Sequence, residues 1–275
     1  MKPRIHLYYF TDPLCSHCWA LDTTLTLFKH AYADYLNIIT VMGGMLESGN
    51  HYDDLKGPLA KEQAKHWDQV GAFYRIPINS EIWMKDPITS SFPSSIAFLL
   101  IQQKDPVQAA KFMRLVREGA FVFEKNIAKK SVLQEMMAQL NIDSEKILET
   151  AFSPEGKQIL INNMQPMIDL SINGFPSVVM VNSRNEGIKV TGARTFDTYK
   201  NALIKIKGDF DDLIEKPTPS LDQLLDIFPH VFFSEIQKIY HVDANQIESY
   251  IRSELKNVPH RIESFKKIRY VQKSI

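Results

Sequence analysis

The segment Tyr9-Phe10-Thr11-Asp12-Pro13-Leu14-Cys15-Ser16-His17-Cys18-Trp19-Ala20 decides the fold of this chain. The apolar residues 5–10 run into the breaker cluster Thr11-Asp12-Pro13, which predicts a buried strand. From Cys15 onward, apolar residues recur at helical spacing, so the two cysteines open a helix. Residues 38–42 predict a second strand, which ends at a Gly-Gly pair. The chain therefore begins with a β-α-β unit, the usual basis of a parallel sheet.

Three further regions follow this unit. Residues 52–168 carry apolar side chains at helical period and predict a large helical insertion. Residues 178–181 and 188–191 predict a hairpin, and residues 196–206 predict a closing helix. We therefore expect an α/β fold in which one domain, residues 1–208, contains the insertion.

The last part of the chain predicts a second, smaller module. Lys216-Pro217-Thr218-Pro219 predicts a short stiff linker, because paired prolines prevent a helix from continuing. Three short amphipathic helices follow, and residues 261–271 predict a small hairpin. Each helix start carries a predicted capping box: Ser220 with Gln223, Ser234 with Gln237, and Asp243 with Gln246. We expect residues 217–275 to form a winged-helix-like module.

Length and composition are those of an ordinary globular protein. The 275 residues suit one elaborated domain with a small appendage. Basic and acidic residues balance at 32 each, which argues against a chain dominated by nucleic-acid or membrane electrostatics. No apolar run approaches the roughly 18 residues of a membrane span, and the N-terminal run is too short for a secretion signal. The chain has only two cysteines, and because they are three residues apart they cannot cross-link distant segments by a disulfide. A fold without such cross-links suits a reducing compartment, so we expect a cytoplasmic protein.

The Cys15-Ser16-His17-Cys18 motif carries the predicted chemistry. The partial positive charge at a helix N-terminus lowers the pKa of a thiol there toward about 3.5–7.5. We expect Cys15 to be the nucleophile, and Cys18 to attack the resulting mixed disulfide and release the substrate. His17 can place its ring near the Cys15 sulfur and stabilise the thiolate, so its predicted role is tuning.

A metal site and a purely structural bridge fit the cysteine pair less well. A structural zinc site usually needs four Cys or His ligands, and no second pair with suitable spacing follows, so we expect no metal. A purely structural disulfide across so short a loop removes little chain entropy. We also expect no cofactor.

Pro176 is the second candidate element. It lies between Gly174-Phe175 and a predicted strand, where an X-Pro bond can be cis and can set a backbone edge beside the cysteines. The alternative is a proline that merely begins a strand. The sequence leaves the isomer open, although the CxxC motif upstream favours the first interpretation.

Residues 9–20, together with Gly174-Phe175-Pro176-Ser177, resemble the DsbA family, especially its cytoplasmic FrnE-like branch. The resemblance covers residues 4–207. The stretches Ile82–Pro87 and Ser90–Pro93 are also similar to that branch. The family has a thioredoxin-like fold with a helical insertion, so the resemblance implies the same fold class as the residue pattern.

The resemblance also implies roles for particular residues. It implies Cys15 as nucleophile, Cys18 as resolving thiol and His17 as tuning residue. Phe175 and Pro176 would form the cis-proline loop that contacts substrate. The implied activity is that of a protein-disulfide oxidoreductase or isomerase, with a dithiol or disulfide protein client or a small thiol as partner.

The proline-linked tail suggests a second class of function. It is similar to the adaptors that deliver the transcription factor Spx to the ClpXP protease, which implies a non-catalytic protein that binds a client through this fold. Family relatives with glutathione transferase or isomerase activity usually carry serine in place of Cys15, which disfavours a conjugating enzyme. The CSHC motif favours the oxidoreductase, and the adaptor is the alternative.

The aromatic residues of the insertion and the basic residues of the tail do not by themselves indicate a site. Aromatic residues of the insertion, Trp67 and Trp83 among them, predict core packing more than a peptide groove. The tail is locally basic, but solvated surface or a protein partner is favoured there over nucleic acid. The basic residues are Lys256, Arg261, Lys266, Lys267, Arg269 and Lys273.

Overall fold

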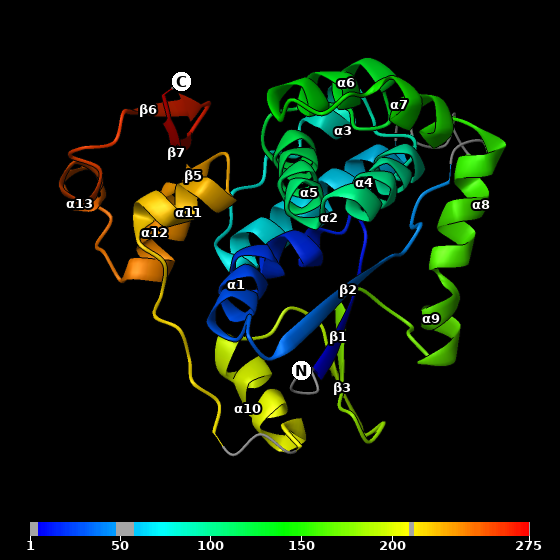
Figure 1. Ribbon diagram of the computed structural model, residues 1–275. Helices are drawn as coiled ribbons and strands as arrows, with labels where there is room; N and C mark the ends of the chain where they lie inside the picture. Colours follow the sequence, from blue (N-terminus) through cyan, green and yellow to red (C-terminus); the bar gives the residue numbers. More distant parts are fainter. Residues whose placement is uncertain (1–4, 48–57, 209–211, 275) are drawn as a thin grey trace. The chain divides into compact units, whose positions relative to one another are not determined.

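The computed structural model describes residues 5–47, 58–208 and 212–274 (Figure 1). The chain divides into two compact units. The sheet unit contains the described residues up to Met45 together with Gln158–Thr218, and the helical unit contains those of Leu46–Lys157 and of Pro219–Ile275. In the described parts of the chain, none of the helices combines the length and the apolar character that spanning a bilayer requires.

A mixed four-stranded sheet forms the centre of the sheet unit. Its strands are β1 (Ile5–Thr11), β2 (Leu36–Met42), β3 (Ser177–Val181) and β4 (Gly187–Thr191), in the spatial order β2-β1-β3-β4. The β1–β2 pair is parallel, whereas β1–β3 and β3–β4 are antiparallel. The four strands predicted from the sequence are all present, and the fold is α/β as expected.

Helices pack on both faces of this sheet. Side chains alternate along β1, so that Leu7 points toward one core and Phe10 toward the other. The first core is shared with α1 (Ser16–Ala31) and α10 (Phe196–Ile206). The second core is smaller and lies against α9 (Gln165–Asp169), which follows α8 (Pro154–Asn163). The two helices expected after the first strand and after the hairpin, α1 and α10, are therefore confirmed.

In its described residues, the predicted insertion consists of helices joined by loops and contains no strand. Its first six helices are α2 (Pro58–Tyr74), α3 (Ile82–Lys85), α4 (Phe92–Lys104), α5 (Pro106–Phe121), α6 (Lys130–Gln139) and α7 (Glu145–Ala151). Residues 52–57 of the predicted insertion lie outside the described residues. Trp67 and Trp83 are 0% and 3% exposed and meet edge to face at 5.2 Å, so they are core residues as predicted.

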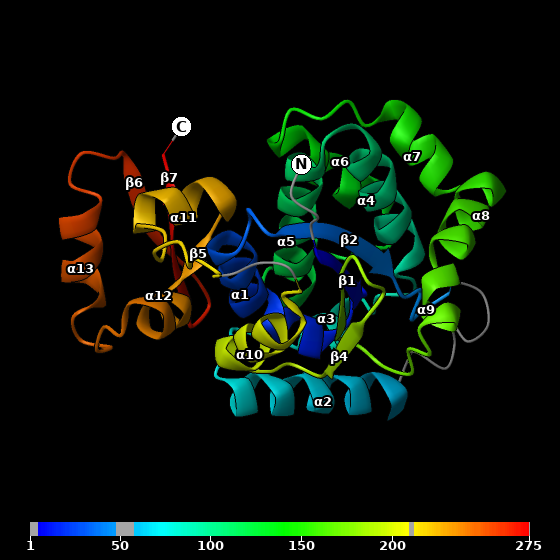
Figure 2. The same ribbon diagram turned by 60° about the horizontal axis from the view of Figure 1, so that its bottom comes forward.

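The tail forms a small sheet with three short helices (Figure 2). Its elements are α11 (Leu221–Ile227), β5 (Val231–Phe232), α12 (Phe233–Tyr240), α13 (Ile247–Glu254), β6 (His260–Phe265) and β7 (Ile268–Lys273). The antiparallel sheet has the order β5-β7-β6, and β6 with β7 is the predicted hairpin. An apolar core, which includes Leu224, Ile251 and Val271, lies within the tail itself.

The predicted helix starts are correct in one case of three. Ser220 and Gln223 form the expected capping box on α11. The Ser234 box is wrong, because α12 begins directly after β5 and the Phe232 backbone N–H donates to the Glu235 carboxylate at 2.9 Å. The Asp243 box is also wrong, because α13 begins at Ile247 without a side-chain cap.

The linker before the tail is attached to the sheet unit. Lys216 donates its backbone N–H to the carbonyl of Ala31 at 2.9 Å, and Ile214 donates its own to the Tyr35 hydroxyl at 2.9 Å. Tyr32 donates its hydroxyl hydrogen to the Glu215 carboxylate. Burial is the main cause that raises the pKa of Tyr32 to about 12, and the hydrogen bond to Glu215 is the second cause. The segment 214–216 is therefore fixed along the end of α1.

A buried ion-pair network joins the tail to α5 inside the helical unit. Arg114 of α5 donates to Glu118 at 2.6 Å and to Glu235 of α12 at 2.9 Å, and these side chains are 6% exposed or less. His230 contacts the other oxygen of Glu118 at 2.6 Å. The Arg114 guanidinium also lies 4.0 Å from the ring centroid of Phe228. The network makes the tail part of the helical unit, and an independently folding module at residues 217–275 stays a prediction.

We predict that Glu235→Ala destabilises the helical unit by about 3 kcal/mol, because it leaves buried Arg114 with one carboxylate fewer and removes the acceptor of the Phe232 N–H. The matched control is Glu248→Ala, which removes an exposed carboxylate of α13 from its pairs with arginine and should have no measurable effect.

The measurement is urea unfolding followed by tryptophan fluorescence in a Trp19→Phe background. Trp67 and Trp83 then report on the helical unit alone. Equal unfolding midpoints for the two alanine variants would contradict a stabilising role of the Arg114 network in the helical unit.

Candidate active site

Three loops meet at one end of the central strand pair. Thr11 at the end of β1 lies opposite Met42 at the end of parallel β2. Because β3 runs antiparallel, its first residue, Ser177, lies opposite Phe10 near that same end of β1. The segments that follow β1, follow β2 and precede β3 therefore emerge side by side, and the first of them carries the cysteines.

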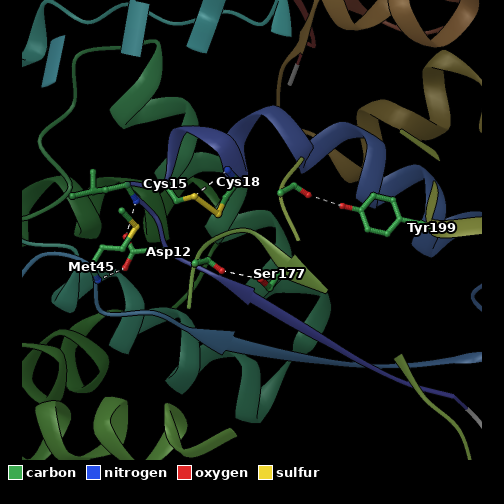
Figure 3. Close-up of a disulfide and its surroundings, with 9 residues drawn as sticks. Asp12, Cys15, Cys18, Met45, Ser177 and Tyr199 are labelled. Carbon is green, nitrogen blue, oxygen red and sulfur yellow. Dashed lines mark hydrogen bonds between the residues drawn. A yellow bond between two sulfur atoms is a disulfide. The ribbon is translucent and has the colours of Figure 1, made fainter. Parts of the chain in front are cut away.

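The two cysteines form a disulfide at the N-terminus of α1 (Figure 3). Cys15 is the N-cap residue, and its sulfur accepts the backbone N–H of Cys18 at 3.1 Å. The Cα atoms are 5.1 Å apart, and the residues are 4% and 0% exposed. His17 lies between them on the first turn and is half-buried. The predicted helix opening at the cysteines is confirmed, while the separate roles of the three residues stay predictions.

Asp12 fixes the loop that leads into the cysteines. Its carboxylate is fully buried and accepts the Leu14 N–H at 2.9 Å and the Met45 N–H at 2.8 Å. Its backbone carbonyl accepts the Cys15 N–H at 3.2 Å. One side chain thus ties the segment before α1 to the segment after β2, as Figure 3 shows.

The Phe175 ring packs directly on the backbone of Gly43. A Cβ atom at Gly43 would lie 2.3 Å from the ring atom Cζ, which is closer than any real contact. The Gly43 N–H donates to the Thr11 carbonyl at 2.7 Å, so this glycine also joins the first two loops. The Phe175 ring can therefore lie this close to the loop after β2 only because Gly43 has no side chain.

The third loop contains the predicted proline element. The Phe175–Pro176 peptide bond is cis, which the sequence left open. The Ser177 hydroxyl donates to the Gly174 carbonyl at 2.8 Å, and the Gly192 N–H donates to the Pro176 carbonyl at 2.8 Å. The loop is thus closed across its own base and tied to the end of β4.

Sequence reasoning missed the supporting residues of this site. In the sequence Asp12 indicates only the end of a strand, although Asp before a turn commonly accepts the N–H two residues on, as it does from Leu14. Nothing local marks Met45 or the contact of Gly43 with Phe175, because both depend on loops far apart in the sequence. In the described ranges, no group of three or more His, Cys, Asp or Glu side chains is arranged to hold a metal ion.

A family model described as thioredoxin matches residues 8–201. The chain belongs to the thioredoxin family. A ClpXP adapter protein named SpxH, from Halalkalibacterium halodurans, is 27% identical over 255 residues, which are 91% of this chain and 82% of that protein. The adaptor relatives suggested by the tail are thus found as sequence relatives.

Two solved structures resemble this thioredoxin-family chain. A candidate protein disulfide isomerase from Nitrosomonas europaea has a TM-score of 0.60 at 19% identity, covering 74% of this chain and 97% of its own. The cytosolic disulfide reductase DsbM from Pseudomonas aeruginosa has a TM-score of 0.54 at 20% identity, covering 72% and 91%. The thioredoxin-like, DsbA-type fold is confirmed, whereas assignment to the FrnE-like branch stays a prediction.

The close contact of Gly43 with Phe175 predicts a non-additive pair of substitutions. Gly43→Ala should destabilise the sheet unit by about 1–3 kcal/mol, because the new Cβ forces the ring to move. In a Phe175→Ala background the same change should cost clearly less, since the ring that opposes it is gone.

The measurement is a double-mutant cycle on chemical unfolding of the full chain. Gly174→Ala is the matched control, because a Cβ there meets nothing within 4 Å and should change stability by less than about 0.5 kcal/mol. A Gly43→Ala effect that is the same with and without the Phe175 ring would rule out this packing.

Proposed function

We propose that this protein is a thiol-disulfide oxidoreductase that exchanges disulfides with protein clients or small thiols through Cys15 and Cys18. The observation that carries the proposal is the position of Cys15 as N-cap of α1, bonded to Cys18 one turn further along. A helix N-terminus favours the thiolate over the thiol, and the thiolate is the attacking form.

The proposed reaction proceeds through a mixed disulfide. In the reduced protein, the Cys15 thiolate attacks one sulfur of a client disulfide, so that a Cys15–client bond forms and the second client sulfur leaves as a thiolate. Cys18 then loses its proton to water, and its thiolate attacks the Cys15 sulfur. The Cys15–Cys18 disulfide forms, the first client sulfur leaves, and two electrons have passed from protein to client. The reverse sequence oxidises a client dithiol.

The neighbouring residues take supporting roles in this proposal. His17 would stabilise the Cys15 thiolate and set the balance between the oxidised and reduced pair. Phe175 and Pro176 would contact the client, since their loop emerges beside the cysteine loop. The proposed location is the cytoplasm; DsbM, one of the structural neighbours, is named as a cytosolic disulfide reductase.

The charges of the tail favour a protein partner over nucleic acid. Lys266 pairs with Glu81 and Glu124, and Arg269 pairs with Glu248 at 2.7 Å. Lys273 pairs with two aspartates of α11. These cations are thus neutralised by carboxylates of the same unit, so we propose that this surface is solvated or contacts a protein rather than nucleic acid.

A non-catalytic adaptor is the second candidate. It is favoured by the SpxH relatives, which are named ClpXP adapters and match this chain over the tail as well as the sheet unit. In this alternative the protein binds a client and delivers it for proteolysis. Disulfide exchange at Cys15 and Cys18 is not required for that role.

Cys18→Ser should accumulate a covalent complex with a disulfide-bearing client, whereas Cys15→Ser should not. Without Cys18 the mixed disulfide at Cys15 has no internal thiol to resolve it. Non-reducing electrophoresis and mass spectrometry measure the complex, and the Cys15→Ser/Cys18→Ser double variant gives the background. Equal trapping by the two single variants would overturn the proposed order of attack.

The adaptor alternative predicts an activity that survives loss of both cysteines. With purified ClpXP and Spx, the wild-type chain and the Cys15→Ser/Cys18→Ser variant should accelerate Spx degradation equally. Reduction of glutathione disulfide by the wild-type chain is measured beside it. Accelerated proteolysis without disulfide turnover would replace the oxidoreductase by the adaptor, and turnover without acceleration would exclude the adaptor.

A further inference from the structure

A pocket of about 270 Å³ lies inside the helical unit, between α5, α6 and the tail. Residues of the segment 115–139 line one side of it, and His230, Phe265 and Tyr270 of the tail line the other. None of these described lining residues belongs to the three loops around the cysteines. The pocket therefore shares no residue with the candidate active site.

Aromatic rings make up much of the pocket wall. The rings are those of Phe123, His230, Phe265 and Tyr270. The centroid of the Phe123 ring lies 5.1–5.6 Å from the centroids of the other three, at interplanar angles of 62–85°. This is the edge-to-face arrangement that aromatic side chains prefer, and a further ring can join it at the same spacing. The wall therefore favours a planar aromatic group.

The rings do not depend on a ligand for their positions. His230 Nδ1 lies 2.6 Å from a carboxylate oxygen of Glu118, which is fully buried. Phe265 lies at the tip of the β6–β7 hairpin, and the next residue, Lys266, pairs with Glu81 at 2.8 Å. A pocket whose walls are already fixed loses less entropy when it binds a ligand.

An exposed ion pair supplies charges of both signs at this pocket. Lys125 Nζ lies 3.1 and 3.0 Å from the two carboxylate oxygens of Glu135, and both residues line the pocket. Their side chains are 43% and 53% exposed, so the pair is weak and both groups are accessible to a ligand. A ligand that carries a carboxylate and an ammonium group side by side can place the first against Lys125 and the second against Glu135. The four charges then alternate in sign.

We propose that this pocket binds a free aromatic α-amino acid. The ring lies among Phe123, Phe265 and Tyr270, and the carboxylate and ammonium groups face Lys125 and Glu135. The pocket volume is just below the range of about 300–1,000 Å³ that drug-sized ligands occupy, which suits a molecule of this size. The bound amino acid contacts α6 and the tail at once, so it stabilises the docking of the tail within the helical unit. This site is independent of disulfide exchange.

The probes are L-phenylalanine and four analogues, and their affinities are measured by calorimetry on the full chain. L-Leucine has no ring and should bind about tenfold more weakly than phenylalanine. Phenylpropionate lacks the ammonium group and phenethylamine lacks the carboxylate, and each should bind about fivefold more weakly. N-acetyl-phenylalanine amide lacks both charges and should bind more weakly still.

The two charge contacts are tested by matching variants to analogues. Lys125→Met should weaken binding of phenylalanine about fivefold but should not weaken binding of phenethylamine, which has no carboxylate. Glu135→Gln should weaken binding of phenylalanine to the same extent but should not weaken binding of phenylpropionate, which has no ammonium group. Lys129→Met is the matched control, because Lys129 is also exposed and pairs with Asp86 at 2.6 Å but does not line the pocket. It should leave every affinity at the wild-type value.

Phenylalanine at saturation should also raise the urea midpoint of the helical unit, since a ligand of the folded pocket stabilises the fold. Any of three results would overturn the proposal. The first is no detectable binding of phenylalanine at millimolar concentration, and the second is an equal loss of affinity in Lys129→Met. The third is binding of N-acetyl-phenylalanine amide as tightly as phenylalanine, because the pocket would then hold an aromatic side chain of a polypeptide.

Discussion

The pairing of β1 with two different partners is the constraint on which the candidate active site depends. Parallel β2 and antiparallel β3 both bond to β1, so the end of β1, the end of β2 and the start of β3 coincide in space. Two side chains join these ends to one another. Asp12 bridges the first two loops, and the Phe175 ring bridges the second and third. A shift in the register of β3 would separate the proline loop from the cysteines while leaving α1 intact.

Local patterns in the sequence were sufficient for the four strands of the main sheet, the tail hairpin and the helix opening at Cys15, whereas the two-residue strand β5 was missed. Alternating or helical periods depend on neighbours within a few residues, and the CxxC motif lies wholly inside one such stretch. The cysteine pair could therefore be found from the sequence alone. The predicted capping boxes at Ser234 and Asp243 were wrong. The first helix start is set by the pairing of β5 with β7, and the second follows a backbone hydrogen bond from Gln246 to Asp243.

Contacts between distant segments could not be predicted in this way. The sequence pattern places Arg114 on the polar side of an amphipathic helix. In the structure it is 2% exposed and donates to Glu235, which follows the linker in the sequence. Loss of one partner from a buried ion pair is strongly destabilising, because it leaves the other charge without compensation, whereas the intact pair adds little net stability. The balance of basic and acidic residues in the composition gives no hint that some of these charges are internal.

The order in which the strands are synthesised follows from the same sheet. Phe10 pairs with Ser177, so β1 and the cysteines leave the ribosome long before the strand that completes their surroundings. At about 5–20 residues per second, the delay is on the order of ten seconds. During that interval a nascent chain has the cysteine loop but lacks the proline loop. The cysteines and α1 can therefore fold before the proline loop that completes their surroundings has been synthesised.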